Sequence, residues 1–158
     1  MLERYVYKNQ QKMRCGYTTG TCACAAAKAA AQMLLSGRKT DKVKVMTPSG
    51  VSLLLDVEDI SMKDTQVSCA IRKDSGDDPD VTNGIYVYAK VSYAEVSYAE
   101  AYYDKGQNEQ KNDKRIIVDG GKGVGRITKK GLSRPVGAAA INPVPLKMIE
   151  AGVMEAAE

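Results

Sequence analysis

Three segments of the sequence carry residue types that could bind a ligand. The first spans residues 16–21, where two glycines, a tyrosine and three threonines lead directly into an alanine-rich run. The first N–H groups of a helix have no partner inside it, so a helix that begins here suits an anion. Its candidate substrate-binding residues are Thr18, Thr19, Gly20 and Thr21. The alternative, in which the threonines only cap the helix, stays open because Thr is a common N-cap residue.

The second segment is rich in glycine and basic residues and spans residues 119–130. Between Lys105 and Lys130 there are eight basic and three acidic residues, a combination that would attract a polyanionic ligand. Neither the G-x-G-x-x-G pattern with a following helix nor the P-loop pattern is met, so a plain glycine-rich turn remains the alternative. The candidate substrate-binding residues here are Gly121, Lys122, Gly123, Gly125, Arg126 and Lys129. No aromatic residues of the kind that read RNA cluster with this run, so we do not expect a nucleic-acid partner.

The third segment is an acidic loop that contains Asp77, Asp78 and Asp80. Closely spaced carboxylates can bind a divalent cation, or they can orient and deprotonate a substrate. Asp and Pro in this order are also typical of a tight turn. The turn is the favoured interpretation, and a role in orienting a cofactor or substrate is the alternative.

Composition limits the chemistry of the chain. The 158 residues suit one domain with its own core, which must be built without Phe or Trp. The absence of His excludes an imidazole base and a His-ligated metal, and we expect no protein-bound metal. The four cysteines match neither a CxxC pair nor a zinc knuckle, so reduced and mostly buried thiols are expected. With no signal-like or membrane-spanning segment, the sequence predicts a cytoplasmic protein without a membrane partner.

These candidate residues must be positioned by a small set of elements. The alanine-rich run predicts a helix from about Thr21 or Cys22 to Ser36, with Gly37 as its left-handed cap. Alternating apolar residues predict a hairpin over residues 42–47 and 51–57, and further strands over 66–73, 85–91 and 115–118. Residues 1–14 are expected to be extended, and a C-terminal helix is expected over residues 143–157, interrupted at Gly152. The repeated pentamer at 91–95 and 96–100 suggests a strand lengthened by duplication. The predicted fold class is α+β, with a mixed β-sheet packed against the Ala-rich helix.

Four blocks of sequence, taken in order, resemble one known family. They are GYTTGTCACAAAKAA, SGDDPDVTNG, DGGKGVGRITKKGL and AINPVPLKMI, which lie between Cys15 and Ile149. The chain is similar to the N-terminal part of the CbiD family of cobalt-precorrin-5B C(1)-methyltransferases. The resemblance implies a CbiD-like N-terminal domain over residues 1–158, with the family's C-terminal methyltransferase domain absent from this chain. It also implies methylation of ring carbon 1 of a cobalt-precorrin, with S-adenosylmethionine as methyl donor, in anaerobic cobalamin biosynthesis.

The resemblance gives the three segments specific expectations. The helix start and the basic run would donate hydrogen bonds to the substrate's carboxylates, and Asp78 or Asp80 would attract the sulfonium or orient a substrate amide. Two alternatives stay open beside the methyltransferase. One is a non-catalytic tetrapyrrole-binding module or truncated remnant, and the other is a phosphate- or nucleotide-binding domain. The sequence does not determine an oligomeric state.

Overall fold

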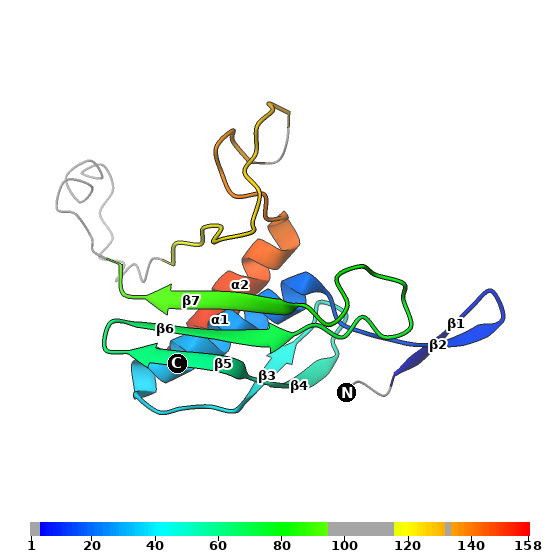
Figure 1. Cartoon of the computed structure of the whole chain (residues 1–158), viewed down its shortest axis with the longest axis horizontal. Helices are drawn as coiled ribbons and strands as arrows, with labels where there is room; N and C mark the ends of the chain where they lie inside the picture. Colours follow the sequence, from blue (N-terminus) through cyan, green and yellow to red (C-terminus); the bar gives the residue numbers. More distant parts are fainter. Residues whose placement is uncertain (1–3, 95–115, 132–133) are drawn as a thin grey trace, which may run out of the picture.

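A computed structural model describes residues 4–94, 116–131 and 134–158. Helix α1 (Thr19–Ser36) is the central element, with helix α2 (Pro143–Ala156) and the strands packed around it (Figure 1). The second copy of the pentamer, at 96–100, lies outside the described residues. Residues 116–118 form no strand, so that part of the prediction is wrong, and Arg115 is not described. The α+β class agrees with the observed elements.

Alanine explains why α1 can occupy the middle of the molecule. Six of its alanines are at most 4% exposed, and the helix is buried on nearly every side along residues 21–33. The predicted C-terminal cap is confirmed, since Gly37 has φ 67° and its N–H bonds to the Met33 carbonyl. The predicted start is too late, however. Thr18 is the N-cap and accepts a hydrogen bond from the Thr21 N–H at 3.2 Å, so Thr19 and Gly20 already belong to the first turn.

The strands pair only in antiparallel fashion within the described residues, in three separate sheets rather than the one mixed sheet expected. Strands β3 (Lys42–Met46) and β4 (Ser52–Asp56) form the predicted hairpin. Strands β5 (Glu58–Lys63), β6 (Gln66–Arg72) and β7 (Tyr86–Ser92) form a three-stranded sheet. Short links such as residues 64–65 permit only antiparallel neighbours, because a parallel pair requires a long crossover.

Three of the described strands were missed by the sequence analysis. Strand β5 follows β4 after Val57, where no turn residue marks the boundary. The N-terminal segment is a hairpin of β1 (Tyr5–Lys8) and β2 (Gln11–Arg14) that projects beyond the body of the molecule (Figure 1). Its turn places Asn9 and Gln10 at φ 50° and 64°, the geometry of a two-residue hairpin turn without the usual glycine.

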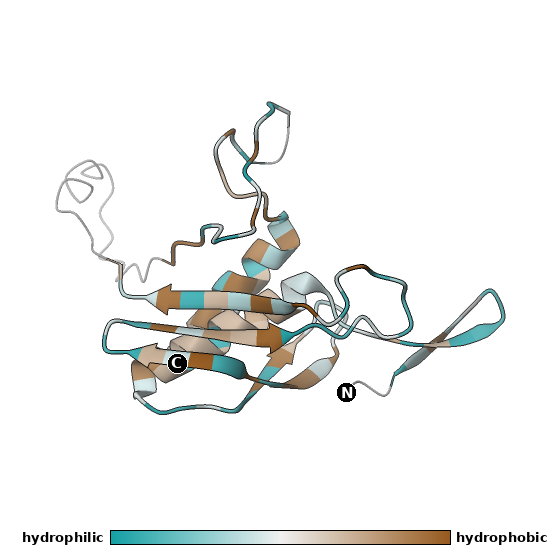
Figure 2. Cartoon of the chain, viewed as in Figure 1, coloured by the Kyte–Doolittle hydropathy of each residue, from teal (hydrophilic) through white to brown (hydrophobic). Residues whose placement is uncertain are grey.

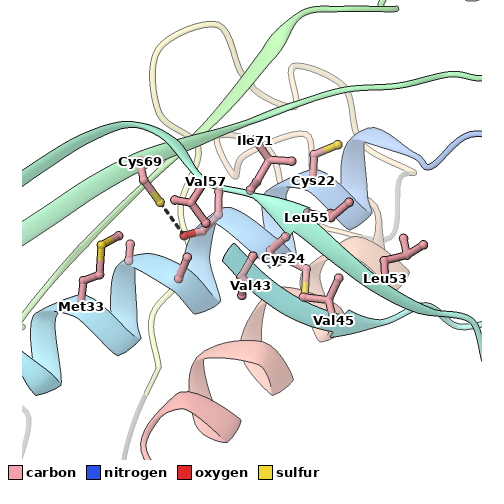
Figure 3. Close-up of a cluster of buried hydrophobic side chains, with 14 of the residues drawn as sticks. Cys22, Cys24, Met33, Val43, Val45, Leu53, Leu55, Val57, Cys69 and Ile71 are labelled. Carbon is pink, nitrogen blue, oxygen red and sulfur yellow. Dashed lines mark hydrogen bonds between the residues drawn. The ribbon is translucent and has the colours of Figure 1, made fainter. Parts of the chain in front are cut away.

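The core lies between α1 and the strands. Val43, Val45, Leu53 and Leu55 extend from the β3–β4 hairpin towards the helix, and Ile71 and Cys69 from β6 complete this layer (Figure 3). The Cys69 thiol donates to the Ala26 carbonyl at 3.2 Å (Figure 3). The strands and α2 carry brown, hydrophobic segments beside the paler α1 (Figure 2).

Helix α2 packs closely on α1 because of the glycine that was expected to interrupt it. Gly152 is buried inside a continuous helix, and a Cβ atom added there would lie 3.0 Å from the Cys24 sulfur. The two helices are also joined by Lys28, which is 5% exposed, pairs with Glu155 at 2.6 Å and donates to the Lys44 carbonyl at 2.8 Å. Asn142 has the extended backbone of an N-cap but makes no side-chain capping bond.

The close approach at Gly152 leads to a test of this packing. We expect Gly152→Val to lower the free energy of unfolding by about 1–3 kcal/mol through overpacking against Cys24. The matched control is Ala151→Val, which introduces the same β-branched side chain at an exposed neighbouring position. Urea denaturation of both variants measures the difference. Equal losses would show that helix propensity, rather than contact with α1, accounts for the effect.

Candidate functional site

A cavity of about 970 Å³ lies where five segments of the chain meet. The start of α1 and the preceding loop contribute one part, and the β1–β2 hairpin, the β3–β4 turn, the acidic loop and the start of α2 contribute the others. Its polar lining residues include Arg4, Arg14, Thr18, Thr19, Ser75 and Asp78. The cavity is at the upper end of the size range of small-molecule sites.

The start of α1 supplies hydrogen-bond donors to this cavity. Thr21 N–H donates to the Thr18 hydroxyl, and Cys22 N–H donates to the Thr18 carbonyl. Within the described part of the chain, the N–H groups of Thr19 and Gly20 have no acceptor. Both residues line the cavity, so the positive end of the helix is open to an anion. All four residues that the sequence analysis chose in this segment, Thr18 to Thr21, therefore lie together at the cavity.

The acidic loop reaches the helix start because two glycines allow the backbones to touch. A Cβ atom at Gly16 would lie 2.2 Å from the Ser75 carbonyl carbon, and one at Gly76 would lie 2.2 Å from the Arg14 carbonyl oxygen. Gly76 also has φ 65°, which disfavours any other residue. The contact buries Ser75 to 7% exposure, and its hydroxyl has no hydrogen-bond partner among the described residues. An unpaired buried hydroxyl in a cavity wall is a further potential contact for a bound ligand.

The three acids singled out in this loop have different surroundings. Asp80 pairs with the buried Lys73 and accepts hydrogen bonds from the Thr82 N–H and hydroxyl, and these contacts hold the pKa of Asp80 well below its usual range. Asp77 accepts a hydrogen bond from the Arg14 N–H at 2.6 Å. Asp78 and Asp80 line the cavity, whereas Asp77 is not part of its lining. The hydrogen bond from the Thr82 N–H to Asp80 is the one expected of a turn.

The glycine-rich basic run occupies a different part of the structure. Among the described residues that line the cavity, none comes from Gly121, Lys122, Gly123, Gly125, Arg126 or Lys129. Arg126 pairs with Asp119 and donates to the Gly120 carbonyl at 2.9 Å, and its backbone bridges to Ala139. The neighbouring Arg126 guanidinium lowers the pKa of the Asp119 carboxyl. The binding role expected of this run stays a prediction.

Sequence reasoning missed several residues of the cavity. Arg14 forms a two-pronged pair with Asp74, with nitrogen–oxygen distances of 2.6 and 2.7 Å, and no local motif marks it. Pro145 packs on the first turn of α1, because a Cβ atom at Gly20 would lie 2.9 Å from its Cγ atom. The INPVP block predicted that a helix starts there, but nothing in it indicated that Pro145 packs against Gly20 of α1.

Tyr17 separates this cavity from a second, smaller one. It lines both, and the second measures about 330 Å³ and includes Asp56, Glu58 and Arg72. The Tyr17 hydroxyl donates to the Arg72 carbonyl at 3.1 Å, and burial raises its pKa to about 12. Tyr17 is therefore neutral at physiological pH and acts as a hydrogen-bond donor in the wall.

No group of three or more His, Cys, Asp or Glu side chains that could hold a metal ion occurs among the residues described. Of the described helices, none is long and apolar enough to cross a bilayer. The cysteines are free thiols, as expected.

The structure is a small α+β domain with a cavity at a helix N-terminus, and known proteins share both its sequence and its fold. A crystal structure of a cobalamin biosynthesis protein (cbiD) from Archaeoglobus fulgidus matches 97% of this chain and 42% of its own, at 29% identity and a TM-score of 0.60. The sequence profile of the CbiD family matches residues 6–158. The chain belongs to the CbiD family, as the sequence resemblance indicated.

Curated relatives extend the comparison. Proteins named cobalt-precorrin-5B C(1)-methyltransferase are 49% identical in Alkaliphilus metalliredigens, 48% in Treponema denticola and 45% in Ruminiclostridium cellulolyticum. These matches cover 98–99% of this chain but only 36–39% of the relatives. The chain thus spans less than two fifths of the length of the proteins that it resembles.

The Lys73–Asp80 pair predicts a pH-dependent stability. We expect Asp80→Asn to lower the melting temperature at pH 7 by several degrees, because the buried Lys73 ammonium loses its counter-charge. The folded-state pKa of Asp80 is depressed, so its contribution is complete above the unfolded value of about 4 and falls as pH drops below it. Thermal melts from pH 3 to pH 7 should show the difference between the two proteins narrowing towards the acid end. Asp78→Asn is the control, and a constant difference across this range would contradict the assignment.

The cysteines should differ in reactivity. Burial raises the pKa of the Cys22 and Cys69 thiols to about 12 and 11, and it raises that of Cys24 as well. Cys15 is half-buried and lines the cavity. Because the thiolate is the reactive form, iodoacetamide at pH 8 should modify Cys15 first in the folded protein and all four cysteines after denaturation. Mass spectrometry of the intact protein and of its peptides measures this, and early modification of Cys22 would contradict the structure.

Proposed function

We propose that this chain forms the N-terminal part of an enzyme that methylates ring carbon 1 of a cobalt-precorrin in anaerobic cobalamin biosynthesis. Family membership and the names of the curated relatives support this proposal. The remaining length of those relatives would supply the methyltransferase domain. A non-catalytic tetrapyrrole-binding module is the alternative for the chain alone.

The cavity at the start of α1 is the observation that carries the proposed substrate site. A cobalt-precorrin is a flat ring with acetate and propionate carboxylates at its edge. The free N–H groups of Thr19 and Gly20, together with the Ser75 hydroxyl, are donors that suit one such carboxylate. Arg4 also lines the cavity and makes no ion pair within the described residues, so it adds a positive charge at the same site.

The proposed methyl transfer does not require a general acid or base. Methyl transfer from a sulfonium to an electron-rich ring carbon depends chiefly on an aligned approach, so positioning can supply much of the rate and the lack of His is no obstacle. S-adenosylmethionine would supply the methyl group on a positively charged sulfur. Asp78 lines the cavity and forms no ion pair with any described residue, so its carboxylate suits that charge.

The basic run could contribute to substrate binding at longer range. Gly121, Lys122, Gly123, Gly125, Arg126 and Lys129 remain proposed binding residues. Because Lys122 and Lys129 are exposed, they would attract a carboxylate-rich ligand by their field rather than by contact within this cavity.

A proline substitution tests the helix start directly. Thr19→Pro removes one free N–H at the first helical position, where proline is tolerated, and Thr18 already has the extended backbone that precedes a proline. We expect the affinity for uroporphyrin, a flat tetrapyrrole with acetate and propionate groups, to fall about tenfold, the typical effect of losing a hydrogen bond to a charged group. Titration followed by the absorbance of the tetrapyrrole measures this change.

The matched control is Thr19→Ala, which keeps the N–H and removes only the hydroxyl. Its affinity should stay within about twofold of that of the parent chain, and both variants should melt within a few degrees of it. Equal affinity of the proline variant and the control would refute the site at the helix start. Tight binding of ATP in place of uroporphyrin would instead favour the nucleotide-binding alternative.

A further inference from the structure

The two faces of the β1–β2 hairpin differ in their relation to the cavity. Val6 and Met13 are opposite each other in the register, and both line the cavity. The neighbouring pair, Tyr7 and Lys12, points to the other face and is not part of the lining. Because successive residues of a strand alternate between faces, Val6 and Met13 share one face of the hairpin, and of the strand residues on the other face only Arg14, at the base of β2, lines the cavity.

The base of the hairpin is fixed to the body of the molecule. The Arg14 side chain pairs with Asp74, and its backbone N–H and carbonyl bond to the Asp77 side chain and backbone N–H. Cys15 forms a bridge with Gly76, directly after β2. An isolated two-stranded hairpin is marginally stable in water, so this anchorage determines where Val6 and Met13 are held. Two of the acidic-loop residues thus position the hairpin.

Val6 remains 47% exposed in spite of this anchorage. Other apolar side chains of the cavity come from the β3–β4 turn, β4 and α2, and they include Val51, Leu53, Val144, Pro145 and Met148. The cavity therefore combines apolar walls with the free N–H groups of the helix start and the charge of Arg4. A small polar anion would leave the apolar walls in contact with water. A flat apolar ring with carboxylates at its edge would use both kinds of surface.

We propose that Val6 and Met13 form an apolar surface that packs against the face of a tetrapyrrole ring whose carboxylate binds at the start of α1. This inference rests on the proposed function and adds a specific role for the hairpin. The hairpin would select for the ring itself, whereas the helix start would recognise any suitable carboxylate.

The test replaces each face of the hairpin in turn. The double variant Val6→Thr and Met13→Gln keeps strand-compatible shapes and removes the apolar surface, and the control Tyr7→Thr and Lys12→Gln changes the adjacent cross-strand pair on the other face. Each protein is titrated with uroporphyrin and, separately, with citrate, a small polycarboxylate without a ring. We expect the first variant to bind uroporphyrin about tenfold more weakly, as the loss of two partly buried apolar contacts implies, with unchanged citrate affinity. The control should bind both ligands like the parent chain.

The possible results separate this inference from the proposed function. Two results would refute the role of the hairpin face. Either the first variant binds uroporphyrin as tightly as the parent chain, or both double variants lose the same amount of uroporphyrin affinity. In either case the cavity remains a tetrapyrrole site. Loss of citrate affinity in the first variant would also refute the role of the hairpin face, because the effect would not depend on the ring. If the parent chain binds citrate but no uroporphyrin, the proposed substrate site itself is wrong.

Discussion

The close packing of an alanine-rich helix on all sides is the constraint on which the rest of the structure depends. Side chains of one carbon let the strands approach α1 from one direction and α2 from another. Gly152 brings α2 against Cys24, and Gly20 brings Pro145 against the first turn of α1. Since two helix starts and the strand connections converge at one end of α1, a cavity forms there. Larger residues along the helix would separate these elements and open the site.

The charged groups around the cavity divide into those that build it and those that remain available. Lys73 with Asp80, and Arg14 with Asp74, are paired within the wall, which keeps the acidic loop and the hairpin in place. The helix-start N–H groups, the Ser75 hydroxyl, Arg4 and Asp78 have no such partners within the described residues. A ligand that binds here would meet a few unpaired groups in a wall whose other charges are already paired, and groups that are held in place before binding favour affinity.

The sequence was most informative where local chemistry alone sets the conformation. The left-handed cap at Gly37, the alternation of Val43 and Val45, and the family motif around Thr18 to Thr21 were all readable without a structure. The hairpin of residues 5–14 was not, because its turn at Asn9 and Gln10 lacks the usual glycine signal. The acidic loop could be seen as a turn, but its contact with Arg14 joins residues about sixty positions apart and leaves no local pattern.

By itself, the sequence determined the central helix, most of the strands, the family and the first group of candidate binding residues, since each depends on neighbouring residues or on a motif. The tertiary structure decided which candidates share a cavity: it placed Thr18 to Thr21 beside Asp78 and Asp80 and left the run from Gly121 to Lys129 outside the lining. It also revealed Ser75, Pro145 and the Val6–Met13 face, which belong to the site only through packing. The physical reason is that close contact between distant segments depends on side-chain volume and backbone approach across the whole core, and neither is recorded in residue spacing.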